Sequence, residues 1–460
     1  MAGILVLRIE GDDDKNSLQR DLVSTLNTEL SKEAPGQKIE VRAHNETVAE
    51  TKGLSQAHAK ARQIGKDCNA LLVIWGNKVD ENKFHPRLTL VERTPPAIKF
   101  QDLSLSVQSI AELRLPEELI KKPLYLTHFI VGYNLHDKGN YTAALVHFEA
   151  ALNRPETDPV ALNDIRLYAA NSHWYLAQSQ NEMAWHLLQA IAYYETARRF
   201  YTAQDFPERW ATTQNNLGSA YWSLPTGSRS DNLQKAITAY EAALRVYTEK
   251  AFPVEWAATQ NNLGIIYTDL PTDERGTNLK KAIAAYKMSL RVYTEKNFPK
   301  EWAMTENNLG TAYAELPIGD RTENLQKAIA AFEAAFRIRT EKDFPVDWAQ
   351  PQNNWGKAYV DLPTGDRTEN LQKAIAAYEL ALRVYTEKDF PMEWARIQEN
   401  LGEVYSDLPT GDRTENLEKA IACYENALKI LRAKPSSDHN LKVAKNIKNA
   451  QTQLQNLAKN

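Results

Sequence analysis

The amino-acid sequence predicts a mostly α-helical solenoid preceded by a small α/β domain. Three observations support this prediction: a 46-residue unit that recurs five times, a helical-hairpin pattern inside each unit, and alternating strand and helix patterns in the first 115 residues. A single hairpin cannot bury its own apolar stripe, whereas stacking the next hairpin on it does. We therefore expect the hairpins to form a one-dimensional array.

The repeat is most visible in residues that recur at steps of 46. A tryptophan, a phenylalanine–proline pair, a glycine and a tyrosine each keep this spacing through five units. The recurring tryptophans and glycines are Trp210, Trp256, Trp302, Trp348, Trp394, Gly218, Gly264, Gly310, Gly356 and Gly402. Chance composition does not hold five units in register, so residues 205–434 are predicted to form five equal structural units.

Each unit is predicted to contain two helices. The first helix of the second unit follows Pro253, because proline lacks the N–H group that would be unpaired at a helix start. In the fourth unit this helix ends before Pro363, since the residue preceding proline avoids the helical region. The second helix starts near Arg367, where Asp366 and Glu369 form a capping pattern. The unit is therefore a helical hairpin.

Segments on both sides extend the array. Residues 116–204 carry the pattern of two divergent hairpins, and the second of these shares apolar positions with the next unit at the 46-residue step. Residues 435–460 contain Leu441, Val443 and Ile447 among lysines and glutamines. This pattern predicts a polar-faced helix that caps the array.

The first 115 residues follow a different pattern. The order βαβαββ is typical of a small α/β layer domain. Strands are predicted at Ile4–Ile9, Lys38–Ala43, Ala70–Gly76 and Arg87–Val91, with helices over residues 18–30 and 55–66. The segment Gly11–Asp14 replaces a glycine-rich phosphate loop, and its three carboxylates would repel a phosphate. We interpret it as a solvated loop, with a metal site as the alternative.

The composition and the missing motifs point away from catalysis, nucleic acid and membranes. Formal net charge is -4 and no long basic stretch occurs, unlike most nucleic-acid-binding proteins. No apolar run approaches the roughly 18 residues that indicate a membrane span. The phosphate-loop, HExxH and GxSxG motifs are absent from the sequence. We expect a non-catalytic protein without a cofactor or a metal ion.

The cysteines and histidines fit the same expectation. Cys68 and Cys423 are the two cysteines, and they form neither a disulfide framework nor a zinc-binding pair, which favours a cytoplasmic protein. Cys423 stands where other units have alanine, so it is interpreted as a core residue. His128, His136 and His147 are interpreted as exposed or packing residues rather than as metal ligands.

The repeat resembles the tetratricopeptide family. Gly264 and Tyr267 match its small residue and the aromatic three positions later, and Ala236, Tyr240 and Ala243 match the alanine–aromatic–alanine pattern of its second helix. Family units have about 34 residues, and the longer unit with Asn-Asn-Leu-Gly is most similar to kinesin-light-chain-type repeats over residues 206–434. The resemblance implies a right-handed superhelix of about seven hairpins. The first 90 or so residues are similar to the N-terminal domain of TolB-like proteins, notably over Ala61–Gly76.

The resemblance also implies a binding groove lined by the first helices of the hairpins. Amide side chains donate and accept hydrogen bonds, so recurring asparagines are suited to the backbone of an extended peptide. The alternative is that they satisfy neighbouring helix ends. The predicted groove residues are Asn215, Asn216, Asn261, Asn262, Asn307, Asn308, Asn353, Asn354, Asn400, Lys357 and Glu403.

Two recurring charged positions complete the predicted site. The first helices end in a mostly acidic row, which favours a basic partner or is simply solvated charge. This row consists of Ser223, Asp269, Glu315, Asp361 and Asp407. A second row is predicted to bond across the loops between units, and it consists of Arg229, Arg275, Arg321, Arg367 and Arg413.

These patterns favour a scaffold that binds a protein or peptide partner. In this interpretation the α/β domain docks a second partner or forms a homo-oligomer. Two other functions stay open from the sequence. One is a sensor or regulatory subunit that controls a partner protease or nucleotide enzyme, and the other is a filament-forming structural protein.

Overall fold

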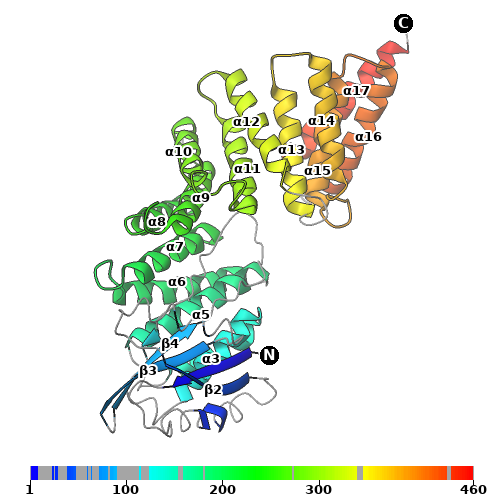
Figure 1. Cartoon of the computed structure of the whole chain (residues 1–460). Coiled ribbons are helices and arrows are strands. Elements are labelled where there is room, and N and C mark those ends of the chain that lie inside the picture. Colours follow the sequence, from blue (N-terminus) through cyan, green and yellow to red (C-terminus); the bar gives the residue numbers. More distant parts are fainter. Residues whose placement is uncertain are drawn as a thin grey trace. The chain divides into compact units, whose positions relative to one another are not determined.

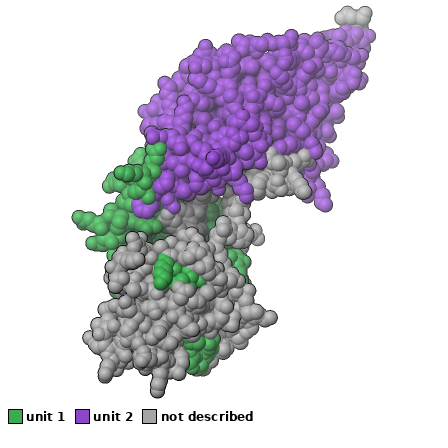
Figure 2. All heavy atoms as spheres, in the orientation of Figure 1, with its two compact units in different colours: residues 1–251 green, residues 252–460 purple. Residues whose placement is uncertain are grey.

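The computed structural model describes residues 2–8, 23–24, 26–28, 39–47, 60, 64, 72–80, 83–90, 113–114, 124–153, 159–179, 182–271, 274–338, 345–432 and 437–458. Figure 1 shows a small sheet and a succession of helices. The chain forms two compact units, residues 1–251 and residues 252–460, which Figure 2 shows in different colours. They are called the N-terminal unit and the C-terminal unit below.

The helices form the seven hairpins expected from the sequence, followed by one further helix. The N-terminal unit contains α3 (Leu124–Asp137), α4 (Tyr141–Leu152), α5 (Pro159–Ser179), α6 (Met183–Phe200), α7 (Pro207–Ser223) and α8 (Arg229–Ala243). The C-terminal unit contains α9 (Pro253–Asp269), α10 (Arg275–Ser289), α11 (Pro299–Glu315), α12 (Arg321–Phe336), α13 (Pro345–Asp361), α14 (Arg367–Leu382), α15 (Pro391–Asp407), α16 (Arg413–Leu431) and α17 (Ser437–Leu457). This part of the chain is an all-α helical-repeat solenoid.

The described strands form one sheet with the order β2-β1-β3-β4-β5. Strand β1 (Ala2–Arg8) runs parallel to β2 (Ile39–Thr47) and to β3 (Leu72–Asp80). Strand β4 (Lys83–Leu90) is antiparallel to β3 and to the short β5 (Leu113–Arg114), which the sequence did not predict. Most of the two predicted helices and the segment Gly11–Asp14 lie outside the described residues.

The hairpin turns follow from a short run of turn residues. In the fourth repeat, Gly365 has a φ of +84°, a conformation that strains residues with a side chain. Asp366 then accepts a hydrogen bond from the backbone N–H of Glu369 at 3.0 Å and so begins α14. The Asn370 amide donates to the Thr364 carbonyl at 2.9 Å and closes the turn. This capping confirms the predicted start of the second helix.

Within a hairpin, the recurring glycine allows the two helices to approach closely. A Cβ atom added to Gly264 of α9 would lie 2.5 Å from Cε1 of Tyr286 on α10. Gly310 stands in the same relation to Phe332, at 2.7 Å. The aromatic ring therefore packs directly on the backbone of the first helix, which is the contact that the tetratricopeptide-like pattern requires. Trp256 and Trp302 of the recurring tryptophans are buried as well.

Helix α17 takes the place of the first helix of a further repeat. Its Val443 is buried against Ala420, Tyr424 and Leu428 of α16. The opposite side of α17 carries mainly lysine, asparagine and glutamine, with Leu441 and Leu457 as exposed exceptions. Its polar outer face is suited to end an array in water.

Candidate protein-binding face

The asparagines that were predicted to line a groove lie on the first helices of the hairpins, and most of them are buried. In the rest of the text, the first-helix face means the accessible surface of α9, α11, α13 and α15 in the C-terminal unit. The buried asparagines are Asn215, Asn216, Asn261, Asn262, Asn307, Asn308 and Asn353. The half-buried ones are Asn354 and Asn400. The first group therefore does not line an open surface in the structure, which corrects their expected placement.

The buried amides bond across successive hairpins. The Asn308 amide donates to Oδ1 of Asn261 at 3.4 Å, and the Asn400 amide donates to Oδ1 of Asn353 at 3.2 Å. In the N-terminal unit, Asn216 donates to Asn171 at 3.1 Å. A buried amide without partners is costly, so these bonds both permit the burial and join neighbouring hairpins. These amides thus bond to other asparagine side chains, whereas the alternative expected from the sequence was that they satisfy neighbouring helix ends.

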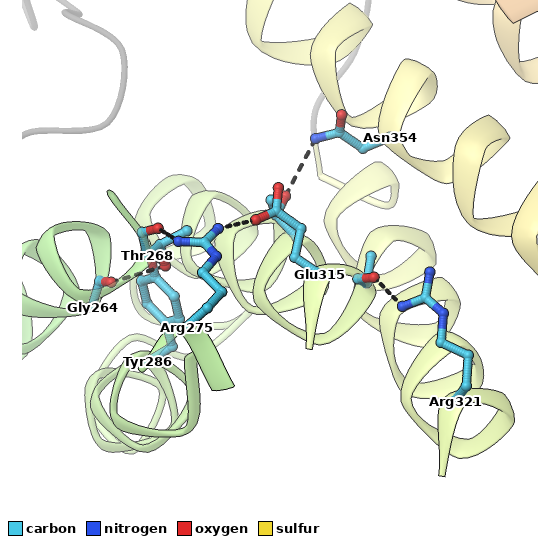
Figure 3. A network of polar contacts seen from close by, with 9 residues as sticks. Gly264, Thr268, Arg275, Tyr286, Glu315, Arg321 and Asn354 are labelled. Atoms are coloured by element: carbon cyan, nitrogen blue, oxygen red, sulfur yellow. Dashed lines mark hydrogen bonds and ion pairs between the residues drawn. The ribbon is translucent and has the colours of Figure 1, made fainter. Parts of the chain in front are cut away.

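Three of the recurring arginines, Arg275, Arg321 and Arg367, pair with an acid of the next hairpin, as predicted for this row. Arg275 donates to the Thr268 carbonyl near the end of α9 and pairs with the Glu315 carboxylate at the end of α11 (Figure 3). Arg321 repeats the pattern with Asp361, at 2.9 Å between Nη2 and Oδ2. The carbonyls in the last turn of a helix lack intrahelical donors, so the arginine satisfies one of them.

These ion pairs show that carboxylates of the acidic row already have cationic partners. Glu315, Asp361 and Asp407 are each paired with an arginine of the preceding hairpin, the last through Arg367 at 3.7 Å. The row therefore presents arginine–carboxylate pairs rather than free acids. A basic partner has to compete with these arginines.

The last repeat differs where α17 packs on it. Glu399 stands at the position that is asparagine in the other four repeats, and it is buried. Lys442 of α17 places Nζ 3.0 Å from Glu399 and 3.2 Å from Glu403. A buried carboxylate needs a cation or several donors, so Lys442 accounts for the change of residue type. The hydrogen bond with Glu399 also raises the pKa of Lys442.

Accessible positions of the first-helix face differ between repeats. Directly after the recurring glycine, Ile265 is buried, Thr311 is half-buried, Lys357 is exposed and Glu403 is half-buried. Arg396 on α15 is exposed as well. The recurring residues are thus used in stacking, whereas the accessible ones give each repeat its own chemistry.

Comparison with known proteins agrees with a helical repeat. The family description "Soluble NSF attachment protein, SNAP" matches residues 345–460. No curated protein matches the chain. The repeat motif together with its glycine–aromatic hairpins decides the class. The helical part is a tetratricopeptide-like repeat array.

Several solved structures of tetratricopeptide and related proteins have a fold similar to this array. A tetratricopeptide repeat protein of Parabacteroides merdae is 15% identical with a TM-score of 0.42, over 72% of this chain and 99% of that chain. BtubC (BKLC) of P. vanneervenii is 19% identical with a TM-score of 0.38, over 56% and 90%. The Rap conjugation gene regulator of plasmid pLS20, in complex with the Phr* peptide, is 15% identical with a TM-score of 0.36, over 70% and 78%.

The first two hairpins of the tetratricopeptide-like array contain buried histidines. Nδ1 of His128 lies 3.1 Å from Nδ1 of His147, and Nδ1 of His136 lies 2.8 Å from Oγ of Ser172. Burial lowers the pKa of His136 to about 4. Among the described residues, no group of three or more metal-ligating side chains lies together, and no helix is long and apolar enough to cross a membrane.

The sequence analysis missed two buried polar groups. His173 and His186 place their Nδ1 atoms 2.9 Å apart between α5 and α6. Asp164 is fully buried and pairs with Arg209 of α7 at 2.9 Å. Both depend on contacts between helices, and neither belongs to a recurring pattern that would have indicated it. Cys423 is half-buried, and burial raises the pKa of its thiol to about 11.

Proposed function

We propose that this protein is a non-catalytic scaffold that binds a segment of another protein on the first-helix face of its C-terminal unit. Tetratricopeptide-like folds are typical of protein and peptide interaction, and repeat arrays present extended surfaces for it. The observation that carries the proposal is a difference between two sets of residues on the first helices. Recurring residues are buried in stacking, and accessible residues vary between repeats.

The variable residues suit specific recognition. Met304, Gln350 and Arg396 occupy the same position in the third, fourth and fifth repeats, and they are apolar, neutral polar and cationic. A partner that spans these helices meets a different group at each step. Among the predicted groove residues, Asn354, Asn400, Lys357 and Glu403 are those accessible to it.

Site-specific photocrosslinking tests the location of binding. A photoreactive amino acid replaces Gln350 on the first helix α13 in one variant and Gln372 on the second helix α14 in a matched variant. Gln350 is half-buried and Gln372 is exposed. We expect one partner, identified by mass spectrometry, to crosslink through position 350 and not through position 372. Crosslinking of the same partner at position 372 alone, or equally at both, would contradict the proposal.

The other predicted functions have less support. The filament-forming function stays a prediction. The regulatory function and a homo-oligomer formed through the α/β domain stay predictions. A basic partner is the weaker option, because arginines already pair with three acids of the row.

A further inference from the structure

The recurring tyrosine near the end of each first helix lies under a lysine of the second helix in the same hairpin. In the fourth repeat, Nζ of Lys373 on α14 lies 5.3 Å from the centre of the Tyr359 ring on α13. An ammonium group this close to an aromatic ring is attracted to its face. The other repeats have the same contact, between Lys235 and Tyr221, Lys281 and Tyr267, Lys327 and Tyr313, and Lys419 and Tyr405.

A glutamate of the preceding second helix joins the lysine and the tyrosine in other repeats. The Tyr359 hydroxyl donates to Oε1 of Glu333 on α12 at 3.3 Å. In the N-terminal unit, the Tyr221 hydroxyl donates to Oε1 of Glu195 at 3.3 Å. Glu379, 46 residues after Glu333, keeps the same residue type. The lysine, the tyrosine and this third residue are called the tyrosine cluster below.

The tyrosine cluster of the third repeat has a second lysine in place of the glutamate. Lys287 of α10 stands 46 residues before Glu333, and its Nζ lies 5.7 Å from the centre of the Tyr313 ring on α11. Nζ of Lys327 on α12 also lies 5.7 Å from the centre of this ring. Two ammonium groups from successive second helices thus lie over one phenol ring. Neighbouring cations repel each other, and a bound anion relieves the repulsion.

The polar groups of this cluster are available to a ligand. Lys287 and Lys327 are exposed. Among the described residues, no carboxylate pairs with Lys287, and no group accepts a hydrogen bond from the Tyr313 hydroxyl, which is not enclosed. Lys327 also pairs with Glu323 at 2.5 Å, but both side chains of this pair are exposed. Exposed pairs contribute little free energy, so Lys327 can turn toward a bound anion.

The charge of the cluster indicates which anion fits. In the fourth repeat, the cluster and the glutamate that pairs with its lysine contain two acids and one cation. In the third repeat, the equivalent residues are two cations and one acid. A phosphate monoester carries about −1.5 to −2 charge at neutral pH and has three strong acceptor oxygens. It therefore compensates this difference in charge and matches two ammonium groups and one hydroxyl, whereas a carboxylate supplies a single charge.

We propose that Lys287, Tyr313 and Lys327 form a binding site for a phosphate group. Its two cations come from the second helices α10 and α12, so the site is separate from the residues that carry the proposed scaffold function. The phosphate belongs either to a phosphorylated side chain of another protein or to free phosphate. Both sources present the same oxygens and the same charge to the cluster.

Fluorescence anisotropy with the full chain tests the site. The probe is a fluorescein-labelled ten-residue glycine–serine peptide with one central phosphoserine, and two reference peptides carry serine or glutamate at that position. We expect the phosphoserine peptide to bind at least roughly tenfold more tightly than either reference, and inorganic phosphate to displace it. A lower Kd for the phosphoserine peptide than for inorganic phosphate assigns the site to phosphorylated chains, and equal values assign it to free phosphate.

Single substitutions locate the binding. Lys287→Glu introduces the residue type that the other repeats carry at this position, so the variant is expected to fold. Its affinity for the phosphoserine peptide should fall at least roughly tenfold. The matched control Lys296→Glu makes the same change of charge at an exposed lysine in the loop after α10, and it should bind like the unmodified chain. Tyr313→Phe removes the hydroxyl alone and should weaken binding to a smaller extent.

The fourth repeat allows the site to be moved. Glu333→Lys places a second lysine beside Tyr359 and Lys373, which reproduces the residue types of the third repeat. Added to Lys287→Glu, this substitution should restore binding of the phosphoserine peptide. Three results would overturn the inference: equal binding of the phosphoserine and glutamate peptides, equal losses in Lys287→Glu and Lys296→Glu, or no recovery in the double variant.

Discussion

Replacing Gly264 with alanine tests the contact that defines the hairpin. The added Cβ would lie 2.5 Å from a ring carbon of Tyr286, and that ring is buried with its hydroxyl 3.3 Å from Oγ1 of Thr268 (Figure 3). Overpacking of this kind costs about 1–3 kcal/mol. Alanine favours a helix over glycine by about 1 kcal/mol. Because Tyr286 is enclosed, we expect a net loss of up to about 2 kcal/mol in the stability of this hairpin.

Gly276→Ala is the matched control, since it makes the same substitution in the same hairpin. Its Cβ would meet the side chain of Ile318 at 3.0–3.2 Å, but Ile318 is exposed and can move. We expect this variant to be neutral or stabilised by up to about 1 kcal/mol. Hydrogen exchange of α9 and α10, read by mass spectrometry, measures both effects locally. Equal protection in the two variants, or higher protection in Gly264→Ala, would refute the packing argument.

Two further predictions concern buried charge. Lys442→Met leaves the buried Glu399 without its cation and should lower the stability of the α17 contact by roughly 2 kcal/mol. The loss should appear as faster hydrogen exchange in α17, and adding Glu399→Asn should restore most of the protection. If Lys442→Met alone leaves exchange in α17 unchanged, the ion pair does not hold this helix. Burial lowers the pKa of His136, and burial with His186 lowers that of His173, to about 4, so folding favours the neutral rings. Their contribution, up to about 3 kcal/mol each, is full above the unfolded pKa of about 6.5 and is lost as pH falls toward 4. Exchange of α3–α6 should therefore rise between pH 6.5 and 4.5 relative to α9–α16, and parallel behaviour of both regions would contradict this.

Spacing predicted the hairpins because each helix start and turn is encoded locally. The structure has the predicted helix starts at Pro253 and after Asp366, and the predicted turn at Gly365. Each of these residues acts on the backbone of its own neighbours. The asparagines were harder to place, since a residue that recurs at every step is equally suited to a groove and to a stacking contact. Only the position of the next hairpin shows that Asn308 donates to Asn261.

Charge posed a related difficulty. The sequence shows an acidic row and an arginine row, but not that Arg321 and Asp361 neutralise each other. Lys357 was predicted to be accessible and is exposed in the structure, whereas the sequence analysis did not single out Arg396, which is exposed as well. Strand β5 is too short to form a period-two pattern, which explains its absence from the prediction.

The arginine–carboxylate pairs bear on how such a chain can grow or shrink during evolution. Arg275, Arg321 and Arg367 each reach an acid 40 residues further along, in the adjoining hairpin. Duplicating or deleting one whole 46-residue segment therefore regenerates a complete junction, with donor and acceptor both supplied. The segment with Glu399 is not equivalent to the others, because Glu399 pairs with Lys442 of α17. Copy number can thus change among the segments that carry these pairs, whereas the segment with Glu399 is not interchangeable with them.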